Sequence, residues 1–312
     1  THNRLEQTKK CIKSIRKNTP EAHEIIFVDN GSTDSTTKWL QGQVRENKNY
    51  RLIENKENQG IVKGRNQGIN LSHGEFIVLL DNDVIVGPGW LSGMSDCLRY
   101  APEAGIIGPM TNSTHGFQQT SDISYLSVDH LDKAVEQFKA HHSHRRIPYR
   151  NLSGFCMLMK RTMLENIGLL DERFESGHFA AEGLCWRASL SGLNNFIAGD
   201  TFIHHSGKTE TPSDRSILND KWTYSLADPQ GKKLAVLKTM DLANNFYFKG
   251  NMDQAVEALI NCITLTPEAM EIYYELTRFF IESKRFPEAW EVIGAMPDAA
   301  RNELKGLEFA GY

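Results

Sequence analysis

The chain has 312 residues, of which 40% are hydrophobic and 24% are charged, and its formal net charge is −4. This composition is ordinary for a globular protein, and the length is enough for about two domains. The isoelectric point near 6.3 means that no overall basic field attracts polyanions, so we predict no nucleic-acid partner. An anionic ligand would have to be held by local groups.

The cysteines and the apolar runs indicate a reducing, aqueous environment. The cysteines are odd in number, widely scattered and never arranged as CxxC, which argues against a disulfide framework and a zinc ribbon. No apolar run approaches the roughly 20 residues of a membrane helix, and no signal peptide opens the chain. We therefore expect a cytoplasmic protein without a membrane span. The cysteines are Cys11, Cys97, Cys156, Cys185 and Cys262.

The first two thirds of the chain alternate between helix and strand patterns. Apolar residues at helical spacing predict a helix over residues 5–17, which Pro20 ends, and a buried strand at Ile25–Val28. Asp34 or Ser35 is the expected N-cap of the next helix. The alternation predicts an α/β fold with a mixed, mostly parallel sheet flanked by helices and with ligands at the carboxyl ends of the strands. Further strands are expected at residues 50–55, 75–83, 106–110, 153–161 and 194–207, and further helices within 58–72, 90–101, 128–142 and 182–192.

The strand in "EFIVLLDND" ends in an unusual group of polar residues. Residues 76–80 are continuously apolar, as in a strand that is covered on both faces, yet Asp81, Asn82 and Asp83 follow at once. Two carboxylates without a neighbouring Lys or Arg would be costly to bury unless a positive group lay between them. A divalent cation bound between the two carboxylates would supply this positive charge.

A histidine cluster, "HHSHRR" at residues 141–146, is a weaker metal candidate. No acidic residue or cysteine accompanies it, so a solvated loop is the favoured interpretation.

The composition changes after about residue 230, where strand signals disappear. Residues 242–263 and 276–297 align at an offset of 34, and this period resembles that of tetratricopeptide repeats, which are stacked helix pairs. Such repeats usually bind protein segments or mediate self-association; a stabilising helical cap is the alternative. The aligned pairs are Leu242 with Leu276, Phe246 with Phe280, Gly250 with Lys284, Ala255 with Ala289 and Leu259 with Ile293.

Several motifs in the first 210 residues resemble the family 2 glycosyltransferases, which have the GT-A fold. They are "THN" before an amphipathic helix, "VDNGSTD", "ENQGIVKGRNQGI", "GEFIVLLDNDVIV", "GLLDERF" and "FIHHSG", in the order and spacing of the family. The resemblance implies a GT-A domain over residues 1–225, and the period of 34 predicts tetratricopeptide-like repeats over residues 226–312. It also implies a first strand that would precede Thr1, outside this numbering.

The resemblance further implies inverting transfer from a nucleotide-diphosphate sugar, most of all a UDP-sugar, to a carbohydrate, lipid or protein acceptor. Asp29 could instead cap the following turn, and Arg65 could form a surface salt bridge. Two other functions stay open: a nucleotide-sugar-binding scaffold with impaired catalysis, and a nucleotidyltransferase of similar fold. The residues expected at the nucleotide are Thr1, Asn3, Asp29, Arg65, Asp81 and Asn82.

The segment Asp81–Asp83 is similar to the DXD motif of the family, which implies Mn²⁺ or Mg²⁺ bridging the two phosphates. Asp83 is the main expected ligand. His204 or His205 is expected to complete the coordination, and the spacing to Gly207 favours His204.

The expected catalytic base departs from the family pattern. The family has an acidic pair ahead of "LC", written EDxDLC, whereas this chain reads "HFAAEGLC". The acidic pair falls on Ala180 and Ala181 and the third acid on Gly183, so Glu182 is the remaining candidate base. Gly154 and Trp186 are expected on the acceptor side.

Overall fold

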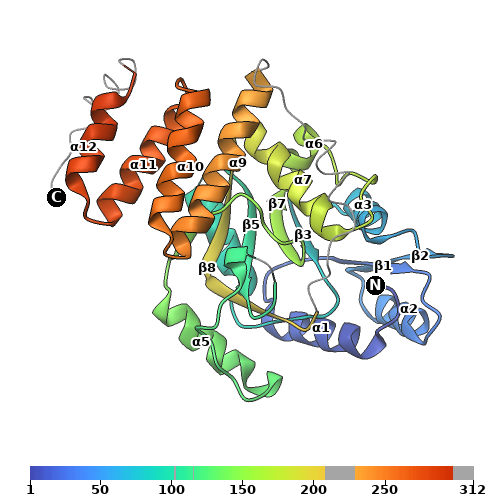
Figure 1. Ribbon diagram of the computed structural model, residues 1–312. Helices are drawn as coiled ribbons and strands as arrows, with labels where there is room; N and C mark the ends of the chain where they lie inside the picture. Colours follow the sequence, from blue (N-terminus) through green and yellow to red (C-terminus); the bar gives the residue numbers. More distant parts are fainter. Residues whose placement is uncertain (102, 115, 208–228, 298–312) are drawn as a thin grey trace. The chain divides into compact units, whose positions relative to one another are not determined.

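A computed structural model describes residues 1–101, 103–114, 116–207 and 229–297. The chain divides into two compact units, residues 1–220 and 221–312, and Figure 1 shows their helices and strands. The boundary expected near residue 225 lies outside the described residues. Each unit is therefore considered by itself.

The first unit is α/β, as predicted, and most of the predicted strands and helices are found. The strands β4 and β6 and the helix α6 were not anticipated. The strands are β1 (Ile25–Asn30), β2 (Tyr50–Asn55), β3 (Phe76–Leu80), β4 (Val84–Val86), β5 (Ala104–Thr111), β6 (Arg146–Pro148), β7 (Cys156–Lys160) and β8 (Asn194–His205). The helices are α1 (Leu5–Asn18), α2 (Thr36–Glu46), α3 (Ile61–Leu71), α4 (Trp90–Tyr100), α5 (Leu131–His141), α6 (Arg161–Ile167) and α7 (Gly177–Leu190), with short 3-10 turns at Gly116–Gln118 and Val128–His130.

The sheet is mixed, as expected, but most of its strand pairs are antiparallel, so the expectation of a mostly parallel sheet is wrong. The main sheet has the order β3-β7-β5-β8-β4, with β6 beside β8, and only β5 and β8 pair in parallel within it. Two further strands, β1 and β2, pair in parallel in a small separate sheet. The sequence could not reveal the strand directions because β5 is buried at every position, and an apolar run reports two covered faces rather than a direction.

The strand order nevertheless brings the polar strand ends together. Because β7 runs antiparallel to both β3 and β5, and β5 runs parallel to β8, the strands β3, β5 and β8 point the same way. Their carboxyl ends therefore meet at one edge of the sheet. Asp81 follows β3, Asn112 follows β5 and His205 ends β8.

The second unit is helical in its described part, with α9 (Pro229–Phe248), α10 (Met252–Leu265), α11 (Met270–Glu282) and α12 (Phe286–Ala295). The turn after α9 is repeated 34 residues later, after α11. Gly250 has φ 79° and Lys284 has φ 60°, and each donates a backbone hydrogen bond of 2.9 Å to the carbonyl three residues earlier. The offset of 34 in the sequence thus recurs in the backbone. None of the described helices combines the length and apolarity that a membrane crossing requires.

Candidate metal and nucleotide site

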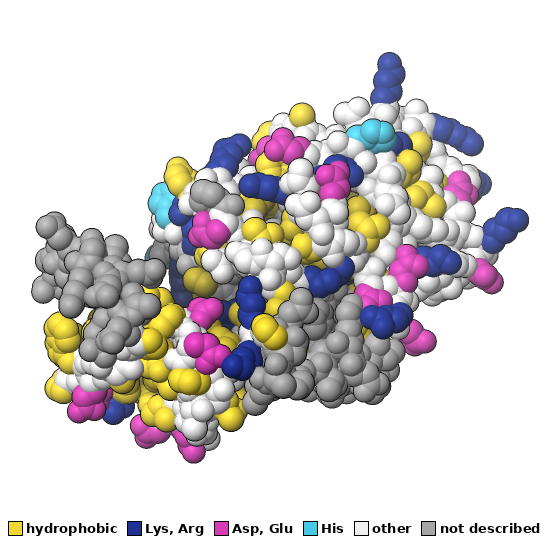
Figure 2. All heavy atoms as spheres, turned by 90° about the horizontal axis from the view of Figure 1, so that it is seen from above, with side chains coloured by type: hydrophobic (Ala, Val, Ile, Leu, Met, Phe, Trp, Pro, Cys, Tyr) yellow, Lys and Arg dark blue, Asp and Glu magenta, His cyan; other side chains and the backbone are white. Residues whose placement is uncertain are grey.

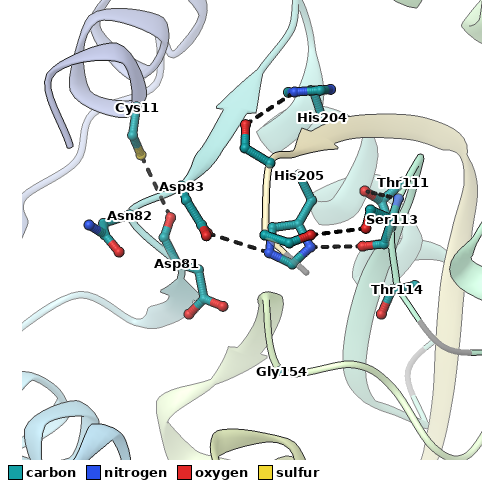
Figure 3. A network of polar contacts seen from close by, with 12 residues as sticks. Cys11, Asp81, Asn82, Asp83, Thr111, Ser113, Thr114, Gly154, His204 and His205 are labelled. Atoms are coloured by element: carbon teal, nitrogen blue, oxygen red, sulfur yellow. Dashed lines mark hydrogen bonds and ion pairs between the residues drawn. The ribbon is translucent and has the colours of Figure 1, made fainter. Parts of the chain in front are cut away.

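The carboxyl-end edge of the main sheet carries a compact group of potential metal ligands. Asp81, Asp83 and His205 each offer one ligand atom, and these atoms all lie within 4.8 Å of one another. Figure 3 shows Asp81 and Asp83 entering this group from the end of β3, and His205 from β8. Among the residues that the structure describes, this is the only such group, so the histidines at 141–146 form none.

His205 has one ring nitrogen fixed and the other directed at Asp83. Its Nδ1 lies 2.8 Å from the carbonyl oxygen of Ser113 and therefore donates to it, while Nε2 lies 3.4 Å from Asp83 Oδ1. The ring also stacks on Phe155 at 5.1 Å between centroids. A histidine that donates through one nitrogen to a carbonyl is oriented to use the other as a metal ligand.

The charges around Asp83 favour its ionised form. Burial by itself would raise the pKa of Asp83, but the hydrogen bond with His205 and the charge of Arg4 lower it below its usual value. Burial would likewise lower the pKa of His205, but Asp83 and the Ser113 carbonyl raise it. The pair is therefore a carboxylate beside a readily protonated imidazole.

Asp81 has its own cation, which the sequence places 16 residues away. Arg65 on α3 lies 2.5 Å from Asp81 Oδ1 through Nη2, and the same nitrogen donates to the carbonyl of Gly154 at 2.8 Å. The Nη1 atom of Arg65 is buried and has no hydrogen-bond partner within the described part of the chain. Arg65 is thus a largely buried partner of Asp81 rather than a surface salt bridge, since its side chain is 11% exposed.

A glycine leaves space beside the ligand atoms. A Cβ built at Gly207 would lie 2.5 Å from His205 Nε2 and 2.9 Å from Asp83 Oδ2. Any larger residue there would push these two side chains aside. The position of Gly207 at the end of "FIHHSG" therefore favours glycine on steric grounds.

The structure corrects the preference for His204 as the metal ligand. The Nδ1 of His204 lies 2.5 Å from the hydroxyl of Tyr125, and its Nε2 lies 3.2 Å from Ser206. Successive side chains of a strand point to opposite faces, so only one of the two histidines can face Asp83. That residue is His205.

Asp29 is committed to its own turn. It is 1% exposed and accepts hydrogen bonds from the backbone and hydroxyl of Ser32 and from the hydroxyl of Thr37. This geometry supports the turn-capping alternative. Asp34 also caps locally, because its carboxylate accepts from the backbone of Thr36 at the start of α2.

Thr1, Asn3 and Asn82 connect the start of the chain to β1 and to the end of β3. The backbone of Thr1 pairs with Val28 and Asn30, and the Asn82 amide donates to the hydroxyl of Thr1 at 3.0 Å. The carbonyl oxygen of the Asn3 side chain accepts from the backbone of Thr33 at 2.8 Å. These groups border the ligand group, but each already has a partner within the protein.

The expected acceptor side is occupied by small apolar groups. Ala180 and Ala181 are fully buried, and a Cβ at Gly154 would lie 3.1 Å from Ala181 Cβ and 3.0 Å from Arg65 Nη1. The helix position that faces Gly154 and Arg65 is therefore 181. Glu182, one residue later, instead accepts a 3.4 Å hydrogen bond from the indole of Trp186.

Trp186 is a poor candidate for stacking on a sugar, which corrects that expectation. It is 4% exposed, so its ring faces are buried in the protein. Gly154 remains beside the site through its carbonyl and through Phe155, whose carbonyl accepts from the backbone of Asp81 at 2.9 Å.

Sequence reasoning missed three residues at the site: Arg4, Asn112 and Ser113. Arg4 Nη1 lies 3.3 Å from Asp83 Oδ2. The Asn112 side chain makes hydrogen bonds with the backbone N–H and carbonyl of His205, and Ser113 supplies the carbonyl that orients its ring. No local pattern marks these residues, because the contacts join segments about 80 to 90 residues apart. Figure 2 shows that acidic and basic side chains are interspersed on one face of the molecule. Among the described residues, no broad basic surface is seen on that face, so an anionic ligand there would be attracted by individual cations near its binding site.

Comparison with known proteins identifies a family and several relatives that this chain resembles. The model of the family described as Glycosyl transferase family 2 matches residues 1–168. Glycosyltransferase GlyG of Streptococcus pneumoniae is 26% identical over 127 residues, which are 41% of each protein. Poly-beta-1,6-N-acetyl-D-glucosamine synthase of Staphylococcus aureus is 22% identical over 61% of this chain and 44% of its own length. The chain thus spans less than half of these curated relatives.

Solved structures share the fold at low identity. Residues 1–349 of S. aureus TarS match with a TM-score of 0.56 and 15% identity, over 89% of this chain and 81% of that one. GalNAc-T7 with UDP, GalNAc and Mn²⁺ matches with a TM-score of 0.55 and 13% identity, over 78% and 50% of the two chains. Because the family model covers more than half of the sequence, this chain belongs to glycosyl transferase family 2.

Proposed function

We propose that this protein transfers a sugar from a nucleotide-diphosphate sugar to an acceptor hydroxyl, with inversion and with a divalent cation. The observation that carries the proposal is the group formed by Asp81, Asp83 and His205 at the edge where β3, β5 and β8 end. Ligands bind at this edge in α/β sheets. UDP is the favoured nucleotide because structures of TarS and GalNAc-T7 with the same fold contain it.

The donor atoms fit Mn²⁺ or Mg²⁺. Two carboxylates and one imidazole suit Mn²⁺ well and Mg²⁺ acceptably, whereas no thiolate is present in the group to favour zinc. Asp83 and His205 would hold the cation, with Asp81 as a third ligand through the oxygen that Arg65 leaves free. When bound, the cation would neutralise charge on the departing diphosphate.

The protein's own residues would arrange the donor. Arg65 holds the Asp81 carboxylate in place, and Ser113 and Asn112 fix the ring and backbone of His205. Preorganised groups of this kind need no rearrangement as charge develops in the transition state. Thr1, Asn3 and Asn82 are the nucleotide-binding residues that we retain from the sequence, and Asp29 supports their turn.

The attacking hydroxyl of the acceptor must lose its proton as the new glycosidic bond forms. Glu182 is the acidic candidate on α7, but position 181, which faces Gly154 and Arg65, carries a methyl group. We therefore propose slow turnover, with Glu182 acting as base after it leaves Trp186. Unchanged turnover in Glu182→Gln would contradict that role.

The test is thermal denaturation with UDP, GDP, dTDP, CDP and ADP, each with Mn²⁺ or with EDTA, followed by detection of nucleoside diphosphate released from the corresponding sugar donors. UDP at about 100 times its dissociation constant should add about 2.7 kcal/mol of stability, and only with Mn²⁺. Asp83→Asn should abolish this effect. Asp96→Asn, which removes an exposed carboxylate from α4, should not.

The outcomes separate the competing functions. Metal-dependent binding with release of UDP from UDP-sugars supports the transferase. Binding without release supports the nucleotide-sugar-binding scaffold. Incorporation of the nucleotide into product, with formation of a new bond at phosphorus, would support a nucleotidyltransferase. No binding of any nucleotide would refute the proposed function.

For the helical unit we propose a tetratricopeptide-like array that binds a protein segment or a second copy of the chain. The support is the turn repeated at Gly250 and Lys284, together with matching buried alanines at 255 and 289. Analytical ultracentrifugation of the full chain tests self-association. Trp290 on α12 is 70% exposed, so Trp290→Asp should weaken any dimer without unfolding the unit.

A further inference from the structure

Arg4 is an exposed cation at a buried carboxylate. Its Nη1 lies 3.3 Å from Asp83 Oδ2, and the side chain of Arg4 is 57% exposed whereas that of Asp83 is 8% exposed. His205 faces the other oxygen of the same carboxylate. Asp83 is therefore shared between a buried imidazole and a long side chain that reaches it from solvent.

The backbone holds Arg4 in this place by an unusual conformation. Asn3 and Arg4 both have positive φ, at 56° and 61°, which is unfavourable for residues that carry a Cβ. Asn3 fixes the segment because its side chain accepts from the backbone of Thr33 and its backbone N–H donates to the hydroxyl of Ser32. Such strained pairs persist only where the surroundings enforce them, and they concentrate at functional sites.

Arg4 is also tied to the start of α1. Its carbonyl accepts from the backbone N–H of Thr8 at 3.1 Å and from the Thr8 hydroxyl at 3.2 Å. The Cα of Arg4 is thus fixed at the helix start while its long side chain stays free to change partner. This distinguishes it from Arg65, which is 11% exposed and bonded to both Asp81 and Gly154.

The charge of Arg4 conflicts with a metal at Asp83. A divalent cation bound to Asp83 Oδ2 would repel a guanidinium that lies 3.3 Å from the same oxygen. A nucleoside diphosphate, which arrives with the cation, carries phosphate oxygens that a guanidinium recognises well. If the Arg4 side chain moved from Asp83 to the phosphate oxygens, it would avoid repulsion by the cation and gain a hydrogen-bond partner.

We propose that Arg4 is an exchangeable counter-ion of the site. It pairs with Asp83 in the metal-free protein and leaves Asp83 for the diphosphate of the nucleotide when cation and nucleotide bind. This inference rests on the proposed function, because it requires a cation at Asp83 and a diphosphate beside it. It adds that Arg4 opposes binding of the metal alone and favours binding of the metal together with the nucleotide.

The test is to measure three affinities in Arg4→Gln by isothermal titration calorimetry. Mn²⁺ alone should bind about threefold to tenfold more tightly, because its competitor for Asp83 is gone. UDP with saturating Mn²⁺ should bind roughly tenfold to hundredfold more weakly, because a hydrogen bond to a charged group is lost. Uridine, which has no diphosphate, should bind as it does to the unaltered protein.

Lys13→Gln is the matched control, since Lys13 is an exposed cation on the same helix; it should change none of the three affinities. Arg4→Lys, which keeps the charge, should shift both affinities in the same directions by less. A circular dichroism spectrum identical to that of the unaltered protein confirms folding of each variant.

Opposite movement of the Mn²⁺ and UDP affinities is the result that a merely structural role cannot give. If Arg4→Gln behaves like Lys13→Gln, or weakens Mn²⁺ and UDP together, the counter-ion role is overturned while the proposed function stands. If the unaltered protein binds neither Mn²⁺ nor UDP, both the counter-ion role and the proposed function are refuted.

Discussion

The donor side and the acceptor side of the site differ in how completely they are built. On the donor side, Asp83 and His205 are paired, and Asp81 has a buried arginine partner. On the acceptor side, α7 presents the buried methyl of Ala181 toward Gly154 and Arg65, and Arg65 Nη1 has no hydrogen-bond partner in the part of the chain that the structure describes. In the function that we propose, the described residues thus include groups for binding a donor, whereas position 181 has a methyl group where a carboxylate would activate an acceptor.

This difference predicts that nucleotide binding and turnover can be altered separately in this domain. The donor-side residues come from the ends of three strands and depend on one another for charge balance. Ala180 and Ala181 lie on one helix and, being uncharged, take no part in that balance. Substitutions that change only one side should therefore affect either nucleotide binding or turnover.

The largest expected effect comes from restoring an acid at position 181. Ala181→Asp should increase the release of UDP from UDP-sugars by about 10²- to 10⁴-fold, the usual contribution of a positioned base. The new carboxylate would lie next to Arg65, whose Nη1 has no hydrogen-bond partner among the described residues and would offset the cost of burying it. Release of UDP, measured by a coupled assay at saturating Mn²⁺, checks this.

Ala181→Asn is the control, because it has the same shape and cannot take a proton. UDP affinity should stay unchanged in both variants. If Ala181→Asp brings no gain while Glu182→Gln abolishes turnover, Glu182 is the base and the acceptor side is complete after all.

A second effect is expected at the glycine beside the metal ligands. Gly207→Ala should weaken Mn²⁺ binding by about 10- to 100-fold, the usual range for disturbed ligand positioning. The added Cβ would meet the ends of two side chains, His205 and Asp83, which can shift without unfolding the protein. Calorimetric titration with Mn²⁺ measures the loss, and the melting temperature should change little.

Gly42→Ala is the matched control, since a Cβ at Gly42 meets nothing within 4 Å. Gly42 lies inside α2, where alanine should add about 0.5 to 1 kcal/mol of stability. Equal Mn²⁺ affinity in Gly207→Ala and the unaltered protein would show that the cation does not bind between Asp83 and His205.

A smaller effect should follow from replacing the arginine that joins the two sides. Arg65→Lys keeps the charge but loses the planar group that reaches both Asp81 and the Gly154 carbonyl. We expect a loss of about 1 to 3 kcal/mol in the free energy of unfolding by urea, from one charge-assisted hydrogen bond. Lys63→Arg, at an exposed position of the same helix, should be neutral. A neutral Arg65→Lys would mean that Arg65 does not connect the two sides.

The sequence predicted the donor side better than the acceptor side for a physical reason. An apolar run that is followed at once by Asp81 and Asp83 is a local signal, and this signal points to the candidate site, although β3 itself is only partly buried. The partners of those carboxylates, Arg4 and Arg65, could not be found in this way because tertiary contacts bring them there. The choice between His204 and His205 depends on which face of β8 packs inward, and that required the register of the sheet.

The prediction of the acceptor side failed for a different reason. The sequence predicted a helix within residues 182–192, whereas α7 begins at Gly177 and includes both alanines; the motif pattern also could not say which position faces the site. The structure places Ala181 against Gly154 and buries Trp186. The direction of the strands was also hidden, because a strand that is covered on both faces has the same apolar run in a parallel and an antiparallel sheet.

The smallest expected effect concerns the stability of the donor side without metal. The pKa of His205 is raised above its usual 6.5, so its contribution to stability is fully present below pH 6.5 and is lost as the pH rises through the folded-state value. The pKa of Asp83 is lowered below its usual 3.8, so its contribution is present above pH 3.8 and is lost as the pH falls through its folded-state value. The pair therefore stabilises the metal-free protein most between these limits.

In EDTA, His205→Gln should accordingly lower the melting temperature by a few degrees near pH 5.5 and by less at pH 8.5, since only the protonated imidazole attracts the carboxylate. His130→Gln, at an exposed position, should show no such pH dependence. With Mn²⁺ the order should reverse, because the metal needs the neutral imidazole and binds more tightly at the higher pH. A destabilisation by His205→Gln that grows with pH in EDTA would mean that Asp83 and His205 are not paired in the metal-free protein, and the donor side would then be no more complete than the acceptor side.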